Sequence, residues 1–316
     1  MNKGQKDQYI LRRRPDSERL VDDGFKKLTI TMASMVALLL GGIFLFVLLG
    51  AQESISRYGV KFLFTSEWNS VTDQYGAFTA IYGTLLTSLA AITIAVPLGV
   101  GTALVITENI LPRKLGNIIG VMVELLAAIP SVVLGLWAIF ILEPFLRPFF
   151  YYLYNHFSWI PIFSTEPIGP GIAPAILILV IMILPIITSI SRDSLNQIPI
   201  TLREGAYGVG ATRWVAIFSI LLPAAVSGIT GGVLLALGRA MGETMAVTMI
   251  IGNSLNFSWS FLSPGNTISA MLANQFGEAD GAQVSSLLYA ALVLMLLTLT
   301  VNIFAQWLVK RLSLKY

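Results

Sequence analysis

The sequence predicts an all-α, polytopic membrane protein with about six transmembrane helices. Three observations predict this class: 55% of the 316 residues are apolar, only 12% are charged, and the mean hydropathy is +0.77. Soluble domains carry about 25% charged residues, so too few charges are present to cover a water-exposed surface. The chain has no cysteine, which excludes disulfides, cysteine metal sites and thiol catalysis. The single histidine, His156, cannot build a metal site alone, and we expect no metal and no cofactor.

The first apolar stretch follows a basic tail. Residues 1–27 carry eight Lys and Arg residues, including Arg12–Arg14, and we expect them to form a cytoplasmic tail. Basic clusters beside a membrane helix are typical of contact with anionic lipid, which we favour over nucleic-acid binding. The span Leu28–Ala51 has 24 residues. A signal-peptide core has about 7–15 residues, so this span should be a retained helix.

Five further apolar stretches complete a six-helix transmembrane domain over residues 28–316. The predicted spans are 80–106, 117–141, 171–190, 223–252 and 284–308. Pro97 and Pro185 lie inside two of them and predict kinks, since neighbouring helices satisfy the freed carbonyl groups, and a break is expected at Ile129–Ser131 inside 117–141. The loop 142–170 is rich in aromatic residues and prolines, which is typical of an interfacial belt.

The basic residues predict the orientation of these spans. Six spans place both termini on one side, and that side carries sixteen Lys and Arg residues, whereas the other side carries three. The positive side of a membrane protein faces the cytoplasm. We therefore expect both termini and the segment 191–222 to be cytoplasmic.

Three charged residues lie inside predicted spans. A central Arg or Glu costs roughly 3 kcal/mol to insert, so Arg239, Glu243 and Glu124 are candidate substrate-translocation residues. Arg239 and Glu243 are four residues apart, so they share a helix face and are expected to form an ion pair. A guanidinium is also well matched to the acceptor oxygens of an oxyanion, so one hypothesis is that Arg239 leaves this pair during transport and accompanies the anion. The alternatives are a static ion pair for these two residues and a structural hydrogen bond for Glu124.

The segment 191–222 is too polar to span a membrane and contains a spaced pattern. Glu204 and Ala206 are followed by Gly210 and then by Leu222–Pro223. This pattern resembles the cytoplasmic loop signature of ABC importer permeases, which usually begins Glu-Ala-Ala, whereas this chain has Gly205 at the second position. The resemblance implies the type I ABC importer permease fold. It also implies that the segment forms short coupling helices, joined by a glycine turn, which dock on a separate ATPase.

Four further motifs narrow the resemblance. They are Glu124–Ser131 (ELLAAIPS), Gly238–Ala246 (GRAMGETMA), Ile251–Asn253 (IGN) and Ala273–Glu278 (ANQFGE). Together they are similar to the PstC-type permease family of bacterial high-affinity phosphate importers, from about Phe62 to the last span. The resemblance implies a complex with a PstA-type second permease, an ATPase dimer and an external phosphate-binding protein. It further implies that the chain lies in the inner membrane of a bacterial cell, where it contacts phosphate and membrane lipid and does not bind nucleic acid.

The chain has no phosphate-binding loop for ATP. None of its eight lysines is followed by Ser or Thr, so the Gly-x-x-x-x-Gly-Lys-Ser/Thr motif is absent. We expect a transport subunit without catalytic activity, driven by a separate ATPase. Alternatives are a permease for another oxyanion and a self-sufficient secondary transporter or channel, which the lack of an evident inverted repeat disfavours. An intramembrane enzyme is disfavoured because Gly-x-Ser-x-Gly and paired aspartates are missing.

Overall fold

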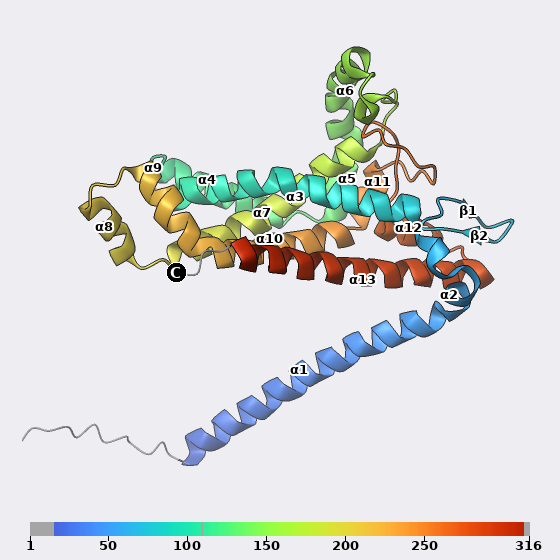
Figure 1. The fold of residues 1–316 in the computed structure, drawn as a ribbon. Coiled ribbons are helices and arrows are strands. Elements are labelled where there is room, and N and C mark those ends of the chain that lie inside the picture. Colours follow the sequence, from blue (N-terminus) through green and yellow to red (C-terminus); the bar gives the residue numbers. More distant parts are fainter. Residues whose placement is uncertain (1–15, 109, 313–316) are drawn as a thin grey trace, which may run out of the picture. The chain divides into compact units, whose positions relative to one another are not determined.

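The structure, a computed structural model, describes residues 16–108 and 110–312, which are mostly helical (Figure 1). Six helices in this part of the chain are long and apolar enough to cross a membrane: Val21–Gly50, Phe78–Thr107, Ser131–Phe157, Ile172–Asn196, Arg213–Gly242 and Gly281–Trp307. The predicted all-α class and the predicted number of spans are confirmed. The bounds of two spans differ from the prediction, for reasons given below.

The chain divides into two units, and the first ends at Leu49. Its described part is the helix α1 (Asp16–Gly50), which runs continuously across residue 27. The predicted tail is therefore helical from Asp16 onward, although the Arg12–Arg14 triplet lies outside the described residues. From Leu28 to Leu49 the helix is apolar on all sides, a pattern typical of a membrane span.

The second unit, from Gly50, is a helical bundle. Its long helices are α3 (Phe78–Thr107), α7 (Ile172–Asn196), α10 (Leu222–Gly242) and α13 (Gly281–Leu312), which run side by side in Figure 1. The largest buried cluster joins α3, α7 and α10 and includes Ala91, Ile183 and Ala236. Small residues bring these helices close: a Cβ at Gly99 of α3 would lie 2.7 Å from Ile187 Cγ2.

The third predicted span, 117–141, is wrong in its bounds. The structure has α4 (Arg113–Ala127), a break at residues 128–130, and then α5 (Ser131–Trp137), the π-helical turn η2 (Ala138–Leu142) and α6 (Glu143–Phe157). A proline disfavours the helical conformation in the residue before it, so α4 ends before Pro130 and a new helix, α5, begins after it. The predicted loop 142–170 is consequently helical as far as Phe157, and α6 projects from the bundle in Figure 1.

The fifth predicted span, 223–252, is also divided. The helix α10 ends at Gly242, Glu243 adopts an extended backbone conformation, and α11 (Met245–Ile250) follows. The span begins earlier than predicted, with α9 (Arg213–Ala216) and the π-helical turn η4 (Ile217–Leu221). Local hydropathy does not reveal the division, because residues on both sides of Glu243 are apolar.

Each π-helical turn stands just before a proline. Leu222 N–H donates to the Ile217 carbonyl and Glu143 N–H donates to the Ala138 carbonyl, each one residue further back than in an α-helix. Pro144 and Pro223 follow directly. A proline lacks the N–H that continues the α-helical ladder, and the wider turn accommodates this defect without breaking the helix.

Short elements close the two ends of the bundle. One end carries α8 (Ile200–Gly208), α9 and the last turns of α13 (Figure 1). The opposite end carries α2 (Gln52–Tyr58), the 3-10 turn η1 (Gly59–Leu63), the hairpin of β1 (Trp68–Asn69) and β2 (Gln74–Tyr75), and α12 (Ile268–Gln275). The 3-10 turn η3 (Pro161–Phe163) follows α6. Within the second unit, these segments gather at the two ends in the grouping that was used to count basic residues.

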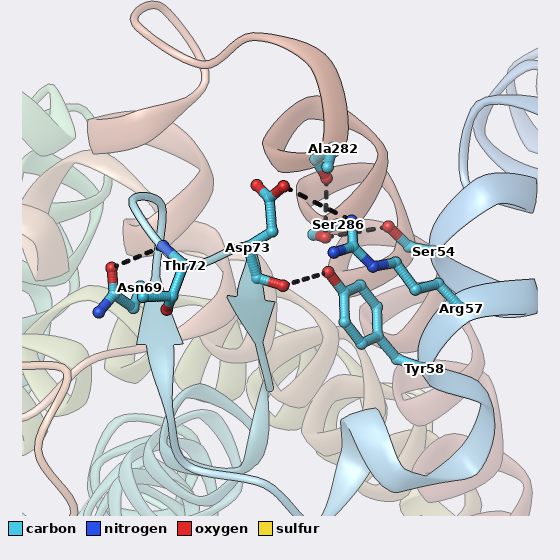
Figure 2. Close-up of polar contacts among 8 residues, drawn as sticks. All are labelled: Ser54, Arg57, Tyr58, Asn69, Thr72, Asp73, Ala282 and Ser286. Carbon is cyan, nitrogen blue, oxygen red and sulfur yellow. Dashed lines mark hydrogen bonds and ion pairs between the residues drawn. The ribbon is translucent and has the colours of Figure 1, made fainter.

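Polar contacts hold α2 to the turn of the hairpin and to the start of α13, as Figure 2 shows. Ser54 Oγ lies 2.9 Å from Ser286 Oγ, and the Tyr58 hydroxyl donates to the Asp73 main-chain oxygen at 2.6 Å. Arg57 and Asp73 form an ion pair at 3.6 Å. Burial raises the pKa of the Tyr58 phenol, although Arg57 opposes the shift, so the hydroxyl stays protonated and able to donate.

Candidate functional site

The predicted pair of Arg239 and Glu243 is present. Arg239 Nη2 lies 3.7 Å from Glu243 Oε2, with the Arg239 side chain 47% exposed and the Glu243 side chain 7% exposed. Glu243 lies just after α10, and its Oε1 accepts from Ala246 N–H at 3.3 Å in the first turn of α11. The carboxylate therefore has a second partner that holds it in place, whereas about half of the Arg239 side chain is exposed.

Arg239 lines a cavity of about 240 Å³. The other lining residues are apolar and come from the end of α4, the break after it, α5 and α7: Leu126, Ala127, Ile129, Leu134, Met182 and Ile186. The expected break at Ile129–Ser131 therefore contributes Ile129 to one wall of the cavity. A cavity with a guanidinium on its wall is suited to an anion, because the planar guanidinium offers several N–H donors to the oxygens of an oxyanion.

Glu124 lies in a different environment from the other two candidates. Its Oε1 accepts from Arg192 Nη1 at 3.1 Å, which links α4 to α7, and its side chain is 63% exposed. Glu124 is not among the residues that line the cavity beside Arg239. The partner is 68 residues away in sequence, so spacing gave no signal for this contact.

The predicted coupling segment forms two short helices joined by a glycine turn. In α8, Glu204 is exposed and Ala206 is buried. Gly210 has φ +82°, a left-handed conformation that glycine adopts without strain, so the predicted turn is present. Thr212 then caps α9, because its Oγ1 accepts from Val215 N–H at 3.4 Å.

Leu222 and Pro223 begin α10 and are half-buried. The segment before them exposes several large apolar side chains, which together we call the coupling surface: Ile200, Leu202, Tyr207, Val209, Trp214, Val215 and Phe218. Contiguous exposed apolar side chains with a polar rim are typical of a protein contact or of membrane contact.

Two further charge pairs, besides those of Arg57 with Asp73 and of Arg192 with Glu124, join residues that the sequence did not predict to meet. Glu143 and Arg147 form a pair with two hydrogen bonds, at 2.9 and 2.7 Å, and their i, i+4 spacing was a usable signal. That signal was lost because residues 142–170 were predicted to be a loop. Glu108 at the end of α3 and Arg203 in α8 pair at 3.0 Å, so only the tertiary fold brings them together.

Comparison with known proteins assigns the family. Residues 95–314 match the family model described as the binding-protein-dependent transport system inner membrane component. The chain belongs to this family. Members of this family are inner membrane components of transport systems. The chain is therefore a transport permease and does not belong to a catalytic family.

Similar permeases are found in bacteria and archaea. The chain is 44% identical to the phosphate transport system permease protein PstC of Mesorhizobium japonicum, covering 93% of this chain and 91% of that protein. It is 38% identical to PstC of Pasteurella multocida, covering 97% and 99%. It is 36% identical to the probable PstC of Methanocaldococcus jannaschii, covering 92% and 94%.

The fold is also that of a solved ABC importer. A chain of the bacterial alginate ABC transporter, solved with an alginate pentasaccharide-bound periplasmic protein, superposes with a TM-score of 0.61 at 18% identity, covering 93% of this chain and 98% of that chain. A chain of the methionine transporter MetNI in an inward-facing conformation gives 0.52 at 20% identity, covering 76% and 95%. At this level of identity the likeness establishes the type I importer permease fold alone.

Proposed function

We propose that this chain is the PstC-type permease subunit of an ATP-driven importer that carries inorganic phosphate across the bacterial inner membrane. The observation that supports it most is similarity to PstC permeases at 36–44% identity over 92–97% of the chain. A cavity lined by apolar residues and by Arg239 is compatible with an anionic substrate. A permease for another oxyanion is the alternative that the geometry leaves open, since a guanidinium binds any of them.

In this proposal Arg239 exchanges partners during transport. At rest it pairs loosely with Glu243, at 3.7 Å, which is too long for a hydrogen bond. An oxyanion entering the cavity offers several acceptor oxygens to the guanidinium and displaces the carboxylate. Glu243 keeps its contact with Ala246 N–H throughout, so the pair can form again when the anion leaves. Glu124 does not contact the anion in this proposal; it links α4, whose last residues line the cavity, to α7 through Arg192.

The partners follow from the same proposal. The end of the bundle with α8 and α9 faces the cytoplasm, as the distribution of basic residues predicts, and both termini lie on that side. An ATPase dimer docks on the coupling surface and on Glu204. A PstA-type second permease completes the membrane unit within the lipid bilayer. The external phosphate-binding protein approaches the opposite end, where α2, the hairpin and α12 lie.

The experiment compares Arg239→Gln with Arg147→Gln in the purified four-component complex in liposomes. Arg147 is a matched control because it is also half-exposed and pairs with a buried carboxylate four residues away, but it is not among the residues that line the cavity. Arg239→Gln should abolish ATP-driven uptake of radioactive phosphate without altering assembly, and Arg147→Gln should retain uptake. Normal uptake by Arg239→Gln would refute the role of Arg239.

A second measurement tests the class of transporter. The chain alone, reconstituted without an ATPase, should not transport phosphate. Transport by the chain alone, or purification in mild detergent without an ATPase bound, would favour the self-sufficient transporter or channel instead.

A further inference from the structure

Glu108 lies where a carboxylate is unfavourable. It is the C-cap of α3, and the negative end of the helix dipole repels an anion there. The last turn of α3 contains no basic residue, and the Glu108 side chain is only 7% exposed. An unpaired buried charge is strongly destabilising. The carboxylate must therefore be compensated by residues from elsewhere in the fold.

The compensation comes from the coupling segment. Arg203 of α8 places its Nη2 3.0 Å from Glu108 Oε1, and the same Nη2 donates to the Leu195 carbonyl of α7 at 2.8 Å. Arg213 of α9 donates through Nη2 to the Glu108 main-chain oxygen. The ends of α3 and α7 and both short helices therefore meet at Glu108.

The helix α8 has little other attachment to the bundle. Ala206 is its only fully buried residue, while Ile200 and Tyr207 are exposed. Apolar packing is therefore small, and the polar contacts of Arg203 provide much of what fixes the position of α8. In the described part of the chain, Glu108 Oε1 and Arg203 Nε lack aligned hydrogen bonds. A charge contact without fixed hydrogen-bond geometry tolerates a change of angle as α8 moves.

We propose that Glu108 is a positioning residue that transmits displacement of α8 to the transmembrane helices α3 and α7; this inference rests on the proposed function. Directly below it, Leu104 of α3 and Leu195 of α7 belong to one buried cluster. Along α7, Met182 and Ile186 line the cavity beside Arg239. A displacement of α8 is thereby transmitted along one helix, α7, to the wall of the candidate substrate cavity.

The test measures phosphate imported per ATP hydrolysed by the complete complex in liposomes. Glu108→Gln keeps the shape of the side chain and removes its charge. The matched control is Glu143→Gln, since Glu143 is also a buried carboxylate paired with an arginine, but that arginine lies on the same helix. The double variant Glu108→Arg, Arg203→Glu restores a pair of opposite sign.

Glu108→Gln should bind the ATPase and hydrolyse ATP, while phosphate imported per ATP falls roughly fivefold or more, the range of coupling between sites in allosteric proteins. The double variant should recover this ratio, and Glu143→Gln should leave it unchanged. An unchanged ratio in Glu108→Gln overturns the proposal. So does a double variant that assembles and stays uncoupled.

Loss of assembly has a defined meaning as well. If Glu108→Gln fails to assemble and the double variant restores both assembly and the ratio, the pair is supported. If neither variant assembles, Glu108 has a purely structural role and the proposal is overturned. Failure of the proposed function is recognised separately, because the unmodified complex would then contain no ATPase or import no phosphate.

Discussion

Replacing Gly210 by alanine should loosen the turn between α8 and α9 without creating a steric clash. No atom lies within 4 Å of a Cβ built on Gly210, so the substitution acts through the backbone alone. The residue has φ +82°, where an L-residue with a Cβ is destabilised by about 1–2 kcal/mol. This free energy corresponds to a roughly 5- to 30-fold loss in the population of the ordered turn.

Hydrogen exchange measures that population directly. The N–H groups of Val209, Gly210 and Ala211 donate to carbonyl groups of α8 at 3.2, 3.0 and 3.1 Å, so their exchange reports opening of the turn. In Gly210→Ala, exchange of these amides should accelerate by the same roughly 5- to 30-fold if opening is local. ATPase bound to the purified chain should fall in parallel.

Gly205→Ala is the matched control. Gly205 also has open space around a Cβ, but it lies within α8 and does not have a positive φ. Alanine is about 1 kcal/mol more favourable than glycine inside a helix, so this variant should slow exchange and keep ATPase binding. It also creates the Glu-Ala-Ala sequence usual in the family. Equal exchange in Gly210→Ala and the unmodified chain, or faster exchange in Gly205→Ala, would refute the reasoning.

Three further predictions concern stability in detergent, measured by thermal unfolding. Gly83→Ala should destabilise by about 1–3 kcal/mol because its Cβ would collide with a main-chain oxygen before α12, whereas Gly101→Ala in the same helix meets no atom and should not destabilise. Ser54→Ala should cost about 1 kcal/mol by removing a buried hydroxyl contact with α13, and the exposed Ser56→Ala should cost less. The pKa of Tyr58 is raised in the folded chain, so the protonated phenol contributes its full stabilisation below pH 10.0, the ordinary pKa, and this stabilisation is lost as the pH rises through the raised pKa. Tyr58→Phe should remove the part of the alkaline unfolding transition that depends on this phenol. An unchanged alkaline transition in Tyr58→Phe would contradict the prediction.

The sequence predicted those features that depend on neighbours along the chain. Apolar runs of sufficient length predicted six spans, since the bilayer sets the length of a crossing helix. The i, i+4 spacing predicted the pair of Arg239 and Glu243, which needs only local geometry. The turn at Gly210 between two short helices was implied by the resemblance to importer permeases, and the positive φ of this glycine agrees with it.

The tertiary structure alone decided which distant residues meet. Glu124 is paired with Arg192, 68 residues away, and the main-chain oxygen of Glu108 is bound by Arg213, 105 residues away. Hydropathy could not locate the division at Glu243, because both sides of it are apolar, and it did not show that the third membrane-spanning helix lies after Pro130 instead of before it. The physical reason is that the apolar composition and the length of a membrane-spanning helix follow from the bilayer around it and are visible in the sequence. A cavity or a junction between helices exists only after the helices have packed.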